Sequence, residues 1–154
     1  MRQLKQLVKD FAWEPLRTEA MEVAGDLLAD EAEVIHKLVG NSWRGNLFGV
    51  AYATTQLFEG ITMAMALFQA VFITTDSLYY QQVEAAVGLE TAWTRYHRLL
   101  TGVTTSAEDT SSVQARGKLT LLLYRETAQL LWPILKGERR SVVEQVLRLI
   151  QQAI

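Results

Sequence analysis

Apolar residues recur at the spacing of an α-helix along almost the whole chain. The first long helix is predicted to begin near Pro15, since proline is tolerated in a first helical turn, and to end at the Gly-Asn pair at 40–41. The sequence shows neither the alternation of a β-strand, nor a hairpin signal, nor an internal repeat. The pattern therefore predicts an all-α protein. The apolar side of this first helix consists of Trp13, Leu16, Met21, Ala24, Leu27, Leu28, Val34, Ile35 and Leu38.

Residues 47–73 follow a short loop at 43–46 and are almost wholly apolar. Their longest stretches without a charge or an amide are far shorter than the roughly 20 residues that a membrane-spanning helix needs. A helix that is apolar on all sides but interrupted by Gln56, Glu59 and Gln69 is typical of the centre of a globular bundle. We therefore expect this helix to form the core, and we expect no membrane-spanning segment.

Three further helical segments complete the predicted fold. Residues 74–77 should cap a helical segment over 78–100, in which Gly88 could introduce a break. A strongly apolar helix over 113–135 should kink or end near Trp132, because Pro133 cannot continue the helical hydrogen bonds. An amphipathic helix over 139–154 follows.

The polar residues at 102–112 predict a mobile surface loop rather than a domain boundary, because too few residues follow them to build a second core. The expected fold is one domain over 1–154. It should be an antiparallel up-and-down bundle of about five or six helices.

The composition narrows the class of protein. A chain of 154 residues, 49% hydrophobic and 21% charged, can bury a core and is not a disordered chain. Its net charge of −2 and the absence of a basic patch argue against nucleic-acid binding. The chain contains no cysteine, which fits a reducing compartment, and residues 1–11 lack the apolar core of a signal peptide. We expect a cytoplasmic protein that binds neither membranes nor nucleic acids.

An acidic ladder is the most informative feature of the sequence. At about 100° per residue its side chains lie within an arc of roughly 80° on the polar side of the first helix. Like charges one helical turn apart repel, so stability alone does not favour such a ladder. Two interpretations remain open: a solvated helix face, or a surface that binds a cation, which the absence of any base between Thr18 and His36 favours. The ladder consists of Glu19, Glu22, Asp26, Asp30 and Glu33 and is followed by Lys37.

Conventional catalytic and metal-binding motifs are absent from the sequence. It has no nucleophile elbow, no glycine-rich phosphate loop and no H-E-x-x-H zinc motif. The two histidines, His36 and His97, lack partners at metal-ligand spacing and are interpreted as helix-surface or helix-packing residues. Glu33 and His36 supply one Glu-x-x-His spacing, whereas a carboxylate-bridged di-iron bundle needs two. No metal site is predicted.

Two further acids interrupt apolar surfaces and are expected to be buried. Glu31 lies on the apolar side of the first helix, and Glu59 interrupts the second. Either carboxylate could pair with Arg116 or Arg125, because a buried acid usually requires a partner. Either could instead line a ligand pocket between helices. The sequence leaves both alternatives open.

The segment Asp30-x-x-Glu33-x-x-x-Lys37 resembles the start of the helical C-terminal domain of aminoglycoside (kanamycin) nucleotidyltransferases. The similarity continues through Gln56 to the predicted helix end at 74–75. In that family a glutamate on the equivalent helix is regarded as the base that activates the drug hydroxyl, and a lysine four residues later contacts nucleotide phosphate. The resemblance implies these two roles for Glu33 and Lys37.

The charge pattern fits such a substrate. Several carboxylates on one helix face would attract a polycationic aminoglycoside, and activation of its hydroxyl by Glu33 would be ordinary general-base chemistry. Asp30, Lys37 and Glu59 are therefore candidate substrate-binding residues.

The chain departs from the family in one respect. The family holds metal-bound phosphates with a Gly-Ser turn and paired aspartates in an N-terminal catalytic domain, and this sequence has none of these features. We expect no cofactor in this chain. Nucleotide and Mg²⁺ are expected only together with a partner catalytic domain.

Three functions remain open at this point. The first is a substrate-binding helical domain that works with a nucleotidyltransferase catalytic subunit. The second is a catalytically silent bundle that dimerises or binds a partner protein through exposed apolar surface. The third is a small-ligand pocket around Glu31 and Glu59. A homodimer is expected, because the chain has more apolar helix surface than a five-helix monomer can easily hide.

Overall fold

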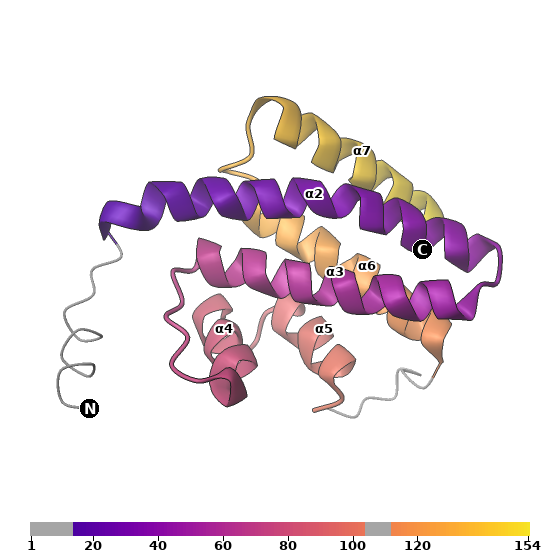
Figure 1. The fold of residues 1–154 in the computed structure, drawn as a ribbon, viewed down its shortest axis with the longest axis horizontal. Coiled ribbons are helices and arrows are strands. Elements are labelled where there is room, and N and C mark those ends of the chain that lie inside the picture. The colour runs from indigo at the N-terminus through magenta and orange to yellow at the C-terminus, as the bar shows by residue number, and fades with distance from the viewer. Residues whose placement is uncertain (1–13, 104–111) are drawn as a thin grey trace.

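The computed structural model describes residues 14–103 and 112–154. These residues form six α-helices and no strand, which confirms the predicted all-α class. Two short 3-10 helices, η1 (Glu14–Leu16) and η2 (Asp76–Leu78), precede α2 and α4. The α-helices are α2 (Arg17–Trp43), α3 (Leu47–Phe68), α4 (Tyr79–Val87), α5 (Ala92–Thr101), α6 (Val113–Leu131) and α7 (Gly137–Ala153), as Figure 1 shows.

The helices form the predicted antiparallel bundle. α2 and α3 make a long antiparallel pair, α6 packs beside α3, and α7 packs beside α2 (Figure 1). The short helices α4 and α5 lie on the side of α3 that faces away from α2, and α5 also packs against α6. α2 and α7 run in the same direction along the bundle, and α3 and α6 both run in the opposite direction (Figure 1).

The first long helix extends beyond its predicted end. α2 continues through the Gly-Asn pair at 40–41 to Trp43, because the chain first takes up a left-handed backbone conformation at Gly45, where φ is +68°. Asn46 then caps α3, and its side chain accepts a hydrogen bond from the backbone N–H of Gly49 at 3.2 Å. The sequence did not show that Gly45, rather than Gly40, would adopt the left-handed conformation beyond the end of α2.

The second helix is shorter than predicted, and the third segment is divided. α3 ends at Phe68 rather than at residue 73, and Ala70 has a positive φ of 52° just beyond it. The predicted cap at 74–77 forms only η2, and no side-chain cap precedes α4. Gly88, with φ of 110°, separates α4 from α5, and Thr91 caps α5. The predicted segment over 78–100 is therefore divided at Gly88 into two separate helices, α4 and α5.

The remaining boundaries agree with the predictions to within a few residues. α6 ends at Leu131, just before Pro133, and α7 begins at Gly137. Gly102 ends α5 in a left-handed conformation, and the Ser112 side chain caps α6. Residues 104–111 of the predicted loop lie outside the described residues, as does Trp13 of the predicted apolar side of the first helix.

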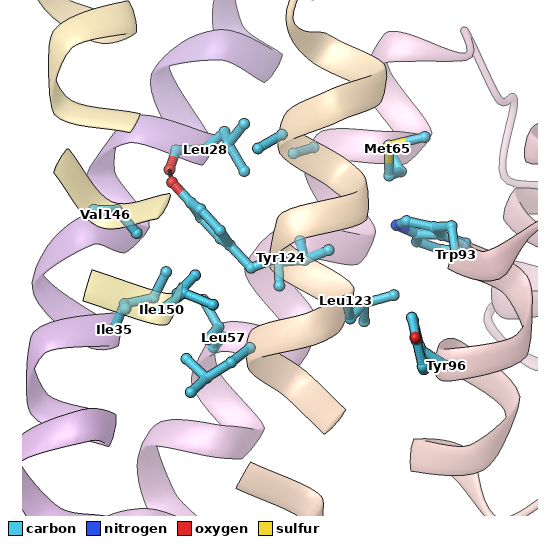
Figure 2. Close-up of a cluster of buried hydrophobic side chains, with 14 of the residues drawn as sticks. Leu28, Ile35, Leu57, Met65, Trp93, Tyr96, Leu123, Tyr124, Val146 and Ile150 are labelled. Carbon is cyan, nitrogen blue, oxygen red and sulfur yellow. Dashed lines mark hydrogen bonds between the residues drawn. The ribbon is translucent and has the colours of Figure 1, made fainter. Parts of the chain in front are cut away.

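One continuous cluster of buried apolar side chains joins the helices. Figure 2 shows Tyr124 of α6 reaching across this cluster, where its hydroxyl donates a hydrogen bond to the backbone carbonyl of Leu28 in α2 at 3.0 Å. On the α5 side, the Trp93 indole N–H donates to the Thr127 hydroxyl at 2.8 Å. The core thus contains two polar contacts that connect α6 to its neighbours on opposite sides.

α3 is only partly enclosed, contrary to the expectation that it is buried all round. Leu57, Ile61 and Met65 on its inner side are inaccessible to solvent. Phe48 on its outer side is 92% exposed, and Tyr52 is 67% exposed. None of the described helices has a stretch long and apolar enough to cross a lipid bilayer.

Replacing Tyr124 with phenylalanine is expected to lower the free energy of unfolding by about 1 kcal/mol, because it removes one buried hydrogen bond and little volume. Urea unfolding followed by circular dichroism measures this change. The control is Lys118→Gln at an exposed site of the same helix, which should change stability by less than about 0.5 kcal/mol. Equal effects of the two substitutions would show that the bond to Leu28 does not stabilise the bundle.

Candidate functional site

The predicted site residues lie on two helices and do not form one cluster. Asp30, Glu33 and Lys37 are exposed on the outer face of α2. Glu59 is on α3 and lines a cavity to which none of those three residues contributes. The structure therefore divides the candidate residues into an outer α2 surface (Asp30, Glu33 and Lys37) and a separate cavity beside Glu59.

Glu33 and Lys37 form an ion pair one helical turn apart, with 2.7 Å between Lys37 Nζ and Glu33 Oε1. The hydrogen bond and the charge of Lys37 lower the pKa of Glu33, and Glu33 in turn raises the pKa of Lys37. Both side chains are therefore charged at neutral pH. Both are also exposed, so a second molecule could reach them.

The middle of the acidic ladder lies close to basic side chains near the start of α7, a contact that was not predicted from the sequence. The Arg139 guanidinium of α7 bonds to the Asp26 carboxylate, with 2.8 Å between Nη2 and Oδ2. Asp26 and Asp30 line a cavity of about 410 Å³ together with Arg139 and Lys136. No basic residue lies within the ladder in the sequence, but the folded chain brings Lys136 and Arg139 next to it. At Asp26 the ladder is therefore a half-exposed ion pair with α7 rather than an unpaired acidic face.

Glu31 packs against Gly60 of α3, so closely that a side chain at Gly60 would collide with the carboxyl group. Its Oε2 atom is buried and has no hydrogen-bond partner within the described residues. Burial, with a smaller contribution from the charge of Asp30, raises the pKa of Glu31 to about 7. A carboxyl group in this position is easily protonated near neutral pH.

Neither arginine that was considered as a partner for Glu31 or Glu59 pairs with them. Arg116 donates a hydrogen bond to the backbone carbonyl of Leu100, and Arg125 pairs with its neighbour Glu126. The expectation that Glu31 or Glu59 forms an ion pair with Arg116 or Arg125 is therefore wrong.

Glu59 is exposed, so the expectation that it is buried is also wrong. It lies on the outer side of α3, and its Oε1 atom accepts a hydrogen bond from the Tyr80 hydroxyl at 2.6 Å. Burial and this bond to a carboxylate raise the pKa of Tyr80. The cavity beside Glu59 has a volume of about 300 Å³, and its wall consists of Thr54, Thr55, Phe58, Glu59, Tyr80, Leu100, Thr101 and Arg116.

A buried polar cluster that sequence reasoning missed lies behind this cavity. His97 of α5 is fully buried, and its Nδ1 lies 2.8 Å from Glu84 Oε1. The second carboxylate oxygen of Glu84 accepts from Arg98 Nε at 2.8 Å. The sequence offered no signal for this cluster, because Glu84 and His97 are on different helices and share no motif.

The His97 cluster has a structural role, because its hydrogen bonds join buried side chains of different helices. Burial lowers the pKa of His97, against the opposing effect of Glu84, which favours a neutral ring that donates from Nδ1 to the carboxylate. The other ring nitrogen lies 3.3 Å from the buried Thr62 hydroxyl. Since His97 and Thr62 are both inaccessible to solvent, no substrate can reach them. The interpretation of His97 as a helix-packing residue agrees with this burial.

No group of three or more histidine, aspartate or glutamate side chains in the described part of the chain could hold a metal ion. Comparisons with protein-family models, with curated proteins and with solved structures found no match to this chain.

Replacing Glu31 with glutamine is expected to stabilise the protein above pH 7 and to have little effect near pH 4. The pKa of Glu31 is raised in the folded state, so its protonated form contributes stability that is complete below the unfolded pKa and is lost as pH rises through about 7. At pH 8 the gain should be about 1 kcal/mol, allowing for solvent screening of a partly exposed group.

Urea unfolding at pH 4, 6 and 8 measures this effect. The control is Glu90→Gln at an exposed position, which should change stability by less than about 0.5 kcal/mol. A constant difference between Glu31→Gln and the wild-type protein over this range would contradict a raised pKa.

Proposed function

We propose that this chain is a helical domain that supports a separate nucleotidyltransferase catalytic subunit and presents the outer α2 surface to a cationic or nucleotide-linked small substrate. The observation that carries the proposal is the exposure of the Glu33–Lys37 pair beside Asp30. A site that is completed by another chain has to be open to that chain. The resemblance to aminoglycoside nucleotidyltransferases supports the same three residues. We place this partnership in the cytoplasm, where a chain without cysteine is at no disadvantage.

The ion pair suggests how the two residues would act together. In the free chain Lys37 holds Glu33 ionised and lowers its basicity. If Lys37 moved to a nucleotide phosphate brought by the partner, Glu33 would lose its hydrogen bond and its pKa would rise toward the ordinary value. A carboxylate with a higher pKa is a better general base for a substrate hydroxyl. The pair would thus be activated only when the nucleotide is present.

Asp30 would contribute charge rather than chemistry. It lies on the outer α2 surface and lines the cavity of about 410 Å³ next to α7. Two carboxylates close together attract an ammonium group more strongly than either does alone. The nucleotide and its Mg²⁺ would be held by the partner, because this chain lacks the paired aspartates of the family.

Titration calorimetry with kanamycin and with Mg-ATP, on the chain alone and mixed with a candidate catalytic subunit, tests the proposal. Kanamycin should bind, and the Glu33→Gln, Asp30→Asn double variant should weaken binding by about tenfold, because two attractive charges are lost. Glu19→Gln is the control, since it removes an exposed carboxylate from the far end of the ladder. No binding of either compound in any combination would refute the proposal.

A second candidate function, a dimeric interaction module, is favoured by a different observation. Large apolar side chains gather where α2 turns into α3: Trp43 and Tyr52 are each 67% exposed, Leu47 is 51% exposed and Phe48 is 92% exposed. Such a cluster is unusual on a monomer and typical of an interface. We propose that a second copy of the chain covers this aromatic turn (Trp43, Leu47, Phe48 and Tyr52).

Analytical ultracentrifugation at tens of micromolar tests the dimer. The wild-type chain should sediment as a dimer, and the Phe48→Ser, Tyr52→Ser double variant as a monomer with an unchanged helical spectrum, because both side chains would lose their apolar contact area. Leu89→Ser is a matched control at an exposed apolar residue outside the turn and should leave the dimer intact. A monomeric wild-type chain at these concentrations would contradict the proposal.

A further inference from the structure

The cavity beside Glu59 brings together groups of opposite charge from different helices. Glu59 contributes a carboxylate from α3, Tyr80 a hydroxyl from α4, and Arg116 a guanidinium from α6. Phe58 and Leu100 add apolar surface between them. A volume of about 300 Å³ is at the lower end of the range of small-ligand pockets. The cavity therefore has room for a small molecule with more than one kind of polar group.

Among the described residues, neither charge in this cavity, that of Glu59 or that of Arg116, has an ion-pair partner. Arg116 uses Nη2 to bond the Leu100 carbonyl at 3.2 Å, which leaves most of its five N–H donors for other acceptors. Glu59 accepts from Tyr80 through one oxygen, so the other oxygen can accept from a ligand.

A third polar group in the wall is buried and has no hydrogen-bond partner in the described part of the chain. Thr54 is only 6% exposed, and its hydroxyl makes no hydrogen bond within the described residues. The neighbouring Thr55 and Thr101 hydroxyls donate to backbone carbonyls, at 3.2 and 3.0 Å. Leaving a buried hydroxyl without a partner is unfavourable, so this exception calls for an explanation. A polar ligand atom in the cavity would provide the missing partner.

We propose that this cavity binds a small zwitterion, with the anionic group of the ligand at Arg116 and its ammonium group at Glu59. Tyr80 and Thr54 would supply further hydrogen bonds, and Phe58 and Leu100 would pack against a short alkyl part. Arginine recognises both carboxylate and phosphate, so an amino acid and an aminoalkyl phosphate share the required chemistry. This ligand is independent of the nucleotidyltransferase partnership, because the cavity does not include the outer α2 surface.

The wall of the cavity is held in place by the buried His97 cluster. The Phe58 ring stacks on the His97 ring with 4.8 Å between centroids, and it meets the Tyr80 ring edge-on at 5.5 Å. The Tyr80 hydroxyl in turn orients the Glu59 carboxylate. Side chains fixed by such contacts lose little freedom when a ligand binds, which favours affinity. The His97 cluster would thus act as a rigid support for the site.

Two-dimensional ¹⁵N NMR of the full chain tests the proposal with L-leucine and O-phosphoethanolamine as probes. At least one probe should shift the backbone amide signals of Thr54, Thr55 and Arg116 and saturate at millimolar concentration. Saturation by leucine alone indicates carboxylate recognition, and saturation by phosphoethanolamine alone indicates phosphate recognition. 4-Methylpentanoate and 3-methylbutylamine, which each keep one charge of leucine, should bind at least about tenfold more weakly than a binding zwitterion.

Three variants locate the bound groups. Glu59→Gln and Arg116→Gln should each weaken binding about tenfold, and Thr54→Val should weaken it while leaving the fold intact. The controls Glu90→Gln and Lys118→Gln change exposed charges outside the cavity and should bind like the wild-type chain. The proposal is overturned if neither zwitterion shifts the cavity amides at tens of millimolar. Equal binding of the single-charge analogues, or unchanged binding by both Glu59→Gln and Arg116→Gln, would overturn it as well.

Discussion

The antiparallel packing of α2 against α3 determines which side chains of both helices reach solvent. Leu28 and Ile35 of α2 and Leu57 of α3 are fully buried in the shared core. Because a helix repeats every 3.6 residues, burying these positions turns Glu33 and Lys37 of α2 to the outside. The same contact turns Glu59 of α3 outward. Both candidate sites are therefore consequences of one interface.

The packing of α7 beside α2 decides the electrostatic character of the acidic ladder. Arg139 and Lys136 lie near Asp26 and Asp30, so the repulsion between neighbouring carboxylates is offset where α7 approaches. Beyond this contact Glu33 is paired with Lys37, and both side chains remain exposed. The ladder thus has a structural part at Asp26 and an open part at Glu33. Only the open part is suited to a partner molecule.

The two candidate sites differ in what they offer a ligand. The outer α2 surface is exposed and acidic, which suits attraction of a large cation and completion by another chain. The cavity beside Glu59 is smaller, carries both signs of charge and is backed by buried aromatic rings. Exposed sites of the first kind bind mainly through charge, whereas concave, partly enclosed sites of the second kind can also select by shape. The fold therefore presents two surfaces with different binding chemistry.

The all-α class, the long helices and the placement of Asp30, Glu33 and Lys37 on one face could be predicted from the sequence, because helical periodicity is a local property. The sequence also placed the break at Gly88 but not the ends of α2 and α3. The packing of the helices was needed to show that Glu59 is exposed and that Glu84 contacts His97. It was also needed to show that Glu31 packs on Gly60 with no hydrogen-bond partner for its Oε2 atom among the described residues. These contacts join residues on different helices, and their geometry depends on how the helices pack.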